Sequence, residues 1–309
     1  MIDLVSLLSL ILSSSPVLQS RNLSSSSPNF HFPKARSLMN SSVVRVMSLV
    51  FLSSFALHPS SFAEGVAMPE MVAHRGASYD APENTVAAIK LAWEQKADGS
   101  EFDIYLTKDG KIVVIHDADT KRTAGVAMPV AKSQFDELRK LDIGTWKNAK
   151  YAGEKIPTLA EMFATVSPGK KVFVEVKCGP EIVPEMVKVM ADSKLKPEQM
   201  PVISFNADVI AATKKARPDV PAYWLVTLNK KTQTVESLIA KAKEIHADGL
   251  DLSASALLDK PFADAIKKAG LKLYVWTVDD PKVAKRMAEI GVDGITTNRP
   301  QWLREQLAK

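Results

Sequence analysis

The alternation of short apolar strands with amphipathic helices is the feature that most constrains this chain. From Met71 onward, the predicted strands are MVAH, SEFDIYL, KIVVIH, KVFVEV, PVISF, AYWLVT, ADGLDLS, KLYVWTV and VDGITT. The predicted helices cover residues 84–97, 158–166, 180–193, 206–216, 232–245, 260–269 and 279–290. Strand–helix alternation over this length favours a parallel α/β fold, and specifically a single-domain (β/α)8 TIM barrel.

Nine predicted strands compete for the eight places of such a barrel. The strands at 100–106 and 111–116 are joined through a tight Asp-Gly turn, which makes an antiparallel hairpin instead of a parallel crossover. One of these two strands must therefore be short, tilted or partly outside the barrel. Between His116 and Pro157 the helical rhythm breaks, which predicts an insertion near the barrel mouth after the third predicted strand.

The first 63 residues are predicted to be a leader. A secretory signal pattern begins near Met39, with Arg45 as its basic part, residues 46–57 as its apolar part and Ser-Phe-Ala before a cleavage site after Ala63. The apolar part is about a dozen residues long, which is short for a membrane span. We favour a true start near Met39 over an unusually long leader, and an uncleaved N-terminal anchor is the alternative.

Export to a periplasm or to the medium would leave residues 64–309 as one domain without a membrane span. The leader holds four of the 40 basic and one of the 35 acidic residues, so the remaining 36 basic and 34 acidic residues carry a net charge of +2. The basic pI of about 9.0 is thus largely due to the leader and does not indicate nucleic-acid binding. Cys178 is the only cysteine, so no intramolecular disulfide can form. The oligomeric state is left open.

Acidic side chains share one face on two of the predicted strands. Because successive side chains of a strand point to opposite sides, Glu101 and Asp103 lie together, and Glu175 lies with Lys177, each pair opposite apolar residues. In a barrel the apolar face packs on the outer helices, so these carboxylates are predicted to point into the lumen. An exposed strand face is the alternative for either pair alone. Oxygen ligands of this kind suit one Ca²⁺ or Mg²⁺ ion better than zinc.

Two histidines, His74 and His116, each end a predicted strand at the side where barrel active sites form. A single histidine of this kind is more often structural. Two beside a proposed metal cluster suit a general acid and a general base near neutral pH.

Arg75 and Lys177 are predicted to bind an anion such as phosphate. An ion pair of Arg75 with Glu83 or Asp80 is the alternative interpretation. The aromatic residues Phe205 and Trp276 end strands at the same mouth and could form the wall of an organic-ligand pocket.

The motifs AHRGASYDAPENT, GSEFDIYLTKDGKIVVIHD, IPTLAEM, VFVEVK, VISF and YVWTV occur in the order typical of the glycerophosphodiester phosphodiesterase family. The chain resembles this family from about Met71 to Trp302. The resemblance implies a TIM barrel that hydrolyses a glycerophosphodiester to glycerol 3-phosphate and an alcohol with the help of a divalent cation. Whether the first nucleophile is water or the substrate's own glycerol hydroxyl is left open, as are the head group and the choice between Ca²⁺ and Mg²⁺.

The resemblance also implies a role for each candidate residue. These roles are acid–base catalysis for His74 and His116, metal binding for Glu101, Asp103 and Glu175, phosphate binding for Arg75 and Lys177, pocket walls for Phe205 and Trp276, support from behind for Glu83, and a helix cap for Asn84.

Two other functions are considered. One is a phospholipase-D-like enzyme that takes lysophospholipid or sphingolipid, which membrane binding would favour, although the sequence shows no amphipathic basic helix for that purpose. The other is a surface binding protein that has kept the barrel and lost turnover. It is disfavoured because the acidic residues and both histidines are all present.

Overall fold

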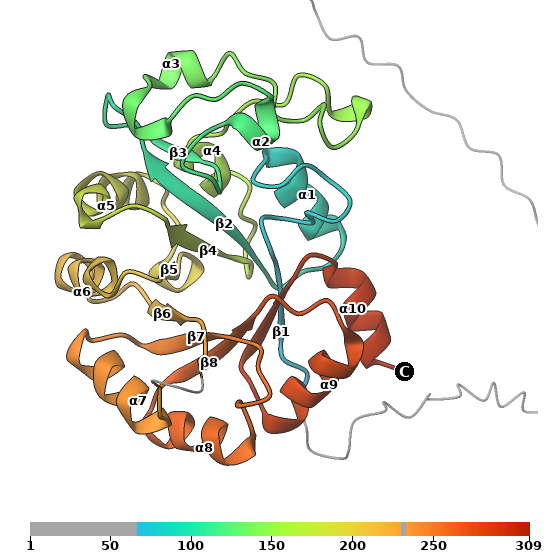
Figure 1. The fold of residues 1–309 in the computed structure, drawn as a ribbon, viewed down its shortest axis with the longest axis vertical. Coiled ribbons are helices and arrows are strands. Elements are labelled where there is room, and N and C mark those ends of the chain that lie inside the picture. The colour runs from blue at the N-terminus through green and yellow to red at the C-terminus, as the bar shows by residue number, and fades with distance from the viewer. Residues whose placement is uncertain (1–66, 230–232) are drawn as a thin grey trace, which may run out of the picture. The chain divides into compact units, whose positions relative to one another are not determined.

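Eight parallel strands close into a barrel in the computed structural model, which describes residues 67–229 and 233–309 (Figure 1). The barrel strands are β1 (Glu70–Ala73), β2 (Gly99–Leu106), β4 (Lys171–Val176), β5 (Val202–Ser204), β6 (Ala222–Val226), β7 (Gly249–Ser253), β8 (Lys272–Trp276) and β9 (Gly294–Thr297). Closure is achieved because β1 pairs in parallel with both β2 and β9. The predicted TIM barrel is therefore confirmed. The predicted leader, with its start near Met39 and cleavage after Ala63, lies outside the described residues.

The ninth strand, β3 (Ile112–Val114), lies outside the barrel, as the hairpin turn predicts. The first part of β2 pairs with β4, whereas residues 104–106 at its end pair antiparallel with β3. The end of β2 thus projects past its barrel neighbour, and β3 folds back along it. This return brings the chain after β3 down to the barrel mouth.

Helices surround the barrel on its outside (Figure 1). They are α1 (Val86–Glu94), α4 (Leu159–Phe163), α5 (Val183–Asp192), α6 (Ala207–Ala216), α7 (Val235–Glu244), α8 (Lys260–Lys268), α9 (Pro281–Ile290) and α10 (Pro300–Leu307). The first seven correspond to the seven predicted helices with shorter bounds, while α10 was not predicted. Within the described part of the chain, no helix has both the length and the apolar character needed to cross a membrane.

The segment between β3 and α4 is the predicted insertion. It holds the short helices α2 (Lys121–Ala124) and α3 (Phe135–Leu138) and packs around a small apolar core of its own that includes Leu138 and Ile156. Two hydrogen bonds tie it to the turn after β1. Lys147 Nζ donates to the Ser78 carbonyl at 2.7 Å, and the Tyr151 hydroxyl donates to the Asp80 carbonyl at 3.1 Å.

The lumen of the barrel is apolar near the amino ends of its strands. Phe173, Tyr223 and Tyr274 pack there with ring centroids 5.1–6.2 Å apart. This aromatic layer fills the lower lumen, as is usual for a barrel of eight strands. Polar side chains are left to collect nearer the carboxyl ends.

Candidate active site

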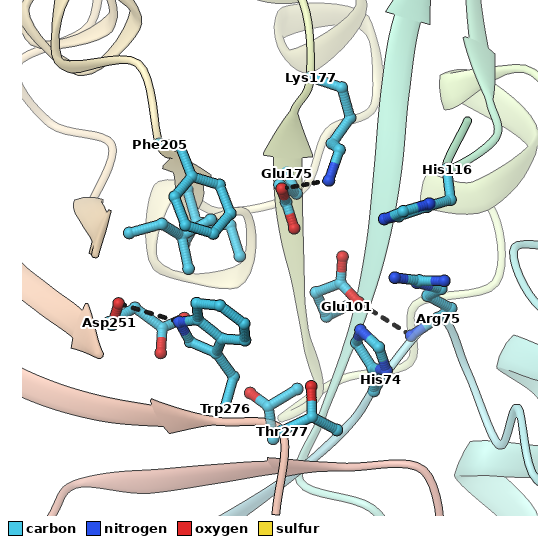
Figure 2. A pocket seen from close by; sticks show the side chains of 13 residues that line it. His74, Arg75, Glu101, His116, Glu175, Lys177, Phe205, Asp251, Trp276 and Thr277 are labelled. Atoms are coloured by element: carbon cyan, nitrogen blue, oxygen red, sulfur yellow. Dashed lines mark hydrogen bonds and ion pairs between the residues drawn. The ribbon is translucent and has the colours of Figure 1, made fainter. Parts of the chain in front are cut away.

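A pocket opens at the carboxyl ends of the barrel strands (Figure 2). The space without protein atoms in and above it, part of which is open to solvent, amounts to about 470 Å³. Eight of the ten predicted site residues line it, namely His74, Arg75, Glu101, His116, Glu175, Lys177, Phe205 and Trp276. The other two, Asp103 and Glu83, contact Arg75 from behind the pocket surface.

The turn after β1 presents His74 and Arg75 to this pocket. It is tight because Arg75 and Gly76 both adopt left-handed backbone conformations, with φ of 52° and 81°. A Cβ atom at Gly76 would lie 2.6 Å from the backbone of Ala88 on α1, so only glycine fits there. The backbone N–H of Arg75 donates to Glu101 Oε2 at 2.8 Å. The turn therefore holds the cationic residue directly against an acidic residue of β2.

Three buried carboxylates form a cluster in the lumen. Glu101 and Asp103 come from β2, and Glu175 lies on β4 in register with Asp103. One oxygen of each lies within 4.8 Å of the others, and the residues are 2%, 0% and 8% exposed. The strand alternation seen in the sequence thus brings the three residues together.

Asn84 supports this cluster, and the prediction that it caps α1 is wrong. Thr85 is the cap, since its Oγ1 accepts a hydrogen bond from the Ala88 N–H at 3.1 Å. Asn84 instead adopts a φ of 59°, donates from Nδ2 to Asp103 Oδ2 at 2.7 Å and accepts from the Asp103 N–H at 3.1 Å. The chain therefore uses the residue before the cap to fix a carboxylate.

Burial and mutual repulsion control the charge of the cluster. Burial, with the charges of Asp103 and Glu175, raises the pKa of Glu101 well above its usual value. Burial and the charge of Asp103 raise the pKa of Glu175 to about 7. Burial also disfavours the ionised form of Asp103, but Arg75 and Lys177 outweigh it and hold that pKa below its usual value. Three carboxylates at this spacing cannot all ionise without a further cation.

The cluster fits a hard divalent cation. Its donors are all carboxylate oxygens, which Ca²⁺ and Mg²⁺ prefer. Oε1 of Glu101 is buried without a hydrogen-bond partner among the described residues, so it is free to act as a ligand.

Arg75 and Lys177 lie on the pocket side of the cluster. Lys177 Nζ is 2.7 Å from Glu175 Oε1 and 3.4 Å from Asp103 Oδ1. Arg75 Nε is 3.3 Å from Asp103 Oδ2, and its Nη1 is 3.0 Å from Glu83 Oε1. The ion pair with Glu83, proposed as the alternative to anion binding, is therefore present. Arg75 nevertheless lines the pocket, so the two interpretations are compatible.

The ring of His74 is held by an amide. Its Nδ1 lies 2.7 Å from Asn298 Oδ1, while Asn298 Nδ2 donates to Asp279 Oδ2 at 2.5 Å. Because the amide oxygen can only accept, Nδ1 of His74 carries the proton and Nε2 is left as an acceptor. Burial, followed by the positive charge of Arg75, lowers the pKa of His74 and favours the neutral ring.

The ring of His116 is held by a carboxylate. Its Nδ1 lies 2.7 Å from Asp117 Oδ1. His116 reaches the pocket because β3 runs back along β2, with the Ile115 N–H bonded to the Asp103 carbonyl. Its position beside the acidic cluster therefore follows from the antiparallel hairpin that the Asp-Gly turn predicts.

Arg122, on α2 of the insertion, was not predicted from the sequence. Its Nη1 and Nη2 each donate to one oxygen of Glu83 at 2.8 Å, and its Nε donates to Asp117 Oδ2 at 2.7 Å. Glu83 also binds Arg75, and Asp117 binds His116. One guanidinium thus links the supports of two pocket residues.

The opposite side of the pocket is aromatic. Phe205 and Trp276 meet edge to face, with ring centroids 5.4 Å apart and an interplanar angle of 87°. Asp251 of β7, a second residue that was not predicted, lies beside Trp276 and away from Arg75 and His116 (Figure 2). Its strand, GLDLS, carries the same alternation of polar and apolar residues that pointed to the acidic cluster.

Comparisons with known proteins agree with this geometry. Residues 74–302 match the model of the "Glycerophosphoryl diester phosphodiesterase family". A glycerophosphodiester phosphodiesterase of Caldanaerobacter subterraneus subsp. tengcongensis is 36% identical over 240 residues, covering 75% of this chain and 95% of the relative. One of Bacillus subtilis is 30% identical over 282 residues, covering 83% and 95%.

Among solved structures, a phosphodiesterase of Oleispira antarctica in complex with the product sn-glycerol-3-phosphate has a TM-score of 0.71 and 28% sequence identity. The match covers 78% of this chain and 98% of that one. The family match spans nearly all of the barrel, from the His-Arg-Gly turn to α10. The chain belongs to the glycerophosphodiester phosphodiesterase family of phosphoric diester hydrolases.

Proposed function

We propose that this barrel hydrolyses glycerophosphodiesters to glycerol 3-phosphate and an alcohol by acid–base catalysis between His74 and His116, with a divalent cation at the acidic cluster. The observation that carries the proposal is the convergence of two histidines, two cations and three buried carboxylates in one pocket. Hydrolysis of glycerophosphodiesters is the reaction of the family, and the division of roles among the residues is our inference.

Glu101, Asp103 and Glu175 would hold the cation, Ca²⁺ or Mg²⁺, through their carboxylate oxygens. When bound, such an ion supplies positive charge that stabilises the negative charge developing on the phosphoryl oxygens. Arg75 and Lys177 add to this charge from the protein. Their side chains are 19% and 16% exposed, so they meet a substrate phosphate in a largely water-excluded site where electrostatic stabilisation is strong.

His74 is assigned the general base. Its Nδ1 proton is committed to Asn298, and the lowered pKa keeps the ring neutral, so Nε2 can accept the proton of the attacking hydroxyl. His116 is assigned the general acid. The Asp117 carboxylate on Nδ1 stabilises the positive charge that the ring carries when it holds a second proton. That proton then goes to the leaving alkoxide.

The test is metal-dependent release of glycerol 3-phosphate. The protein is stripped with EDTA and assayed on glycerophosphocholine with Ca²⁺, Mg²⁺ or neither restored. We expect turnover only with a restored cation, and loss of at least ~100-fold in a His116→Ala variant. A folded, metal-loaded protein that releases no glycerol 3-phosphate from any short glycerophosphodiester would overturn the proposal. Release of choline and lysophosphatidic acid from lysophosphatidylcholine by the same protein would then favour the phospholipase-D-like alternative.

A further inference from the structure

Asp251 is a buried carboxylate of the pocket that the proposed mechanism does not use. We propose that Asp251 binds the hydroxyl groups of the substrate's glycerol arm and so selects diesters that contain glycerol. This inference rests on the proposed function and identifies the residue that recognises the glycerol arm of the substrate. It is carried by the burial of Asp251, its unpaired oxygen and its neighbours.

The strand geometry directs Asp251 inward. On β7 its neighbours Leu250 and Leu252 pack in the outer apolar core, so alternation turns Asp251 to the lumen. The residue is 2% exposed and lines the pocket. Its Oδ1 is buried and has no hydrogen-bond partner in the part of the chain that the structure describes. A buried carboxyl oxygen without a partner is unfavourable unless a ligand supplies one.

The surroundings of Asp251 suit a polyol. The Trp276 indole N–H donates to the Asp251 backbone carbonyl at 3.1 Å, which fixes the ring beside the carboxyl group. Thr277 and Thr296 bring hydroxyl groups to the same pocket. A short polyol can pack its C–H groups on the Trp276 indole and direct its hydroxyls to the Asp251 carboxyl group. This side of the pocket therefore offers the polyol both an apolar contact and a hydrogen-bond partner.

Depth decides which arm of the diester reaches Asp251. The phosphate is expected between Arg75, Lys177 and the acidic cluster, on the far side of the pocket from Asp251 (Figure 2). Phe205 is 45% exposed and forms the rim, whereas Asp251 lies deep. The short glycerol arm therefore fits the deep position, and the variable head group leaves past Phe205. A quaternary ammonium group would favour several aromatic faces around it, whereas Phe205 turns toward Trp276 edge to face.

The experiment compares substrates with and without glycerol. The full chain and its Asp251→Leu and Asp251→Asn variants are assayed on glycerophosphocholine, glycerophosphoglycerol and bis(4-nitrophenyl) phosphate, which has no hydroxyl group. We expect Asp251→Leu to lower the ratio of kcat/KM for glycerophosphocholine to that for bis(4-nitrophenyl) phosphate by ~100-fold. The reason is that a site that hydrogen-bonds a substrate hydroxyl strongly prefers substrates that carry it, and leucine removes that hydrogen bond. The Asn variant should recover most of the ratio, since an amide both donates and accepts.

The outcomes separate this inference from the proposed function. Equal losses on the two glycerol diesters support a role at the glycerol arm, whereas a loss confined to the choline substrate overturns it. An unchanged ratio of kcat/KM for glycerophosphocholine to that for bis(4-nitrophenyl) phosphate also overturns it. This includes the case in which the rates on all three substrates fall by the same factor.

Calorimetry gives a readout that does not need turnover. Asp251→Leu should weaken binding of sn-glycerol 3-phosphate by at least ~10-fold and leave the affinity for inorganic phosphate nearly unchanged. A protein that hydrolyses no diester but shows this difference would retain the inference and overturn the proposed function. Equal weakening of both ligands would overturn the inference.

Discussion

At the residue scale, the partners of the two histidines predict different responses to the leaving group. His116, held by Asp117, is assigned the acid, and a leaving group that departs without a proton makes an acid unnecessary. We expect His116→Ala to lose at least ~100-fold in kcat on glycerophosphocholine but less than ~10-fold on a 4-nitrophenyl diester. His74→Ala should lose activity on both, because the attacking water or hydroxyl group still needs a base. Steady-state kinetics on the two substrates measure the difference.

His246 provides the matched control. It follows α7 at the amino end of β7 and does not line the pocket, so His246→Ala should leave both rates within ~2-fold of the parent. If His74→Ala is the variant restored by the nitrophenyl leaving group, the acid and base assignments are reversed.

The sequence predicted those site residues whose signal is local. Glu101, Asp103 and Glu175 follow from the period-two alternation of their strands. The alternation of β7 shows Asp251 in the same way, but a single acid on a strand that also carries serine and glycine does not stand out. Asn298 is different in kind, since it contacts His74 across 224 positions of the chain, and no local pattern contains that contact.

At the element scale, the insertion supports two pocket residues through Arg122 of α2. Arg122 joins Glu83, which supports Arg75, to Asp117, which supports His116. We expect Arg122→Ala to lower kcat on glycerophosphocholine by ~10- to 100-fold, the usual cost of removing such supporting contacts. Arg122→Lys should not restore the rate, because an ammonium group cannot make the forked contact with Glu83 and also reach Asp117.

The neighbouring Lys121 is the control for this prediction. Its Nζ donates to the carbonyl of Gly125 within the same turn, so Lys121→Ala should leave kcat unchanged. Thermal melting of all three variants separates positioning from unfolding. An Arg122→Ala enzyme with normal kcat, or one whose loss merely follows a lower melting temperature, would contradict the role in positioning.

Element types were better predicted than element limits. Every predicted strand is present because β-branched runs with flanking turns mark strands strongly. Helix α1 begins at Val86 and not at 84, since the Thr85 hydroxyl caps it while Asn84 is drawn to Asp103. Helix α10 was missed because it has only 8 residues and few of them are apolar, yet Leu303 is fully buried against the barrel. Tertiary contacts decided these cases.

At the scale of the whole molecule, the acidic cluster destabilises the folded barrel when its carboxyl groups ionise. The pKa of Glu175 is about 7 in the fold against an ordinary value of 4.5, because of burial and the charge of Asp103. A raised pKa in the folded state gives stability that is present below pH 4.5 and lost as the pH rises through 7. A divalent cation bound by the ionised carboxylates would offset that loss, so we expect cation and proton to compete for one site.

This competition predicts how stability depends on metal and pH together. A cation at 100 times its Kd stabilises by about 2.7 kcal/mol, which for a domain of this size raises the melting temperature by roughly 5–10 °C. We expect a rise of this size when Ca²⁺ or Mg²⁺ is added at pH 7.5 and a much smaller one at pH 5, where protons occupy the cluster. Differential scanning calorimetry against EDTA measures both.

A Glu175→Gln variant links that behaviour to the active site. The amide removes one ligand and one titrating group, so the stabilisation by cation should shrink at pH 7.5 and its difference between the two pH values should largely disappear. Glu185→Gln, on α5, is the control, because Glu185 lies outside the lumen and forms an ion pair with Lys188. If the cation binds in the lumen, this variant keeps the stabilisation by cation at pH 7.5 and its difference between the two pH values. Equal stabilisation at both pH values in the parent protein would mean that the ion binds elsewhere. The cluster that the barrel assembles from β2 and β4 would then need another explanation.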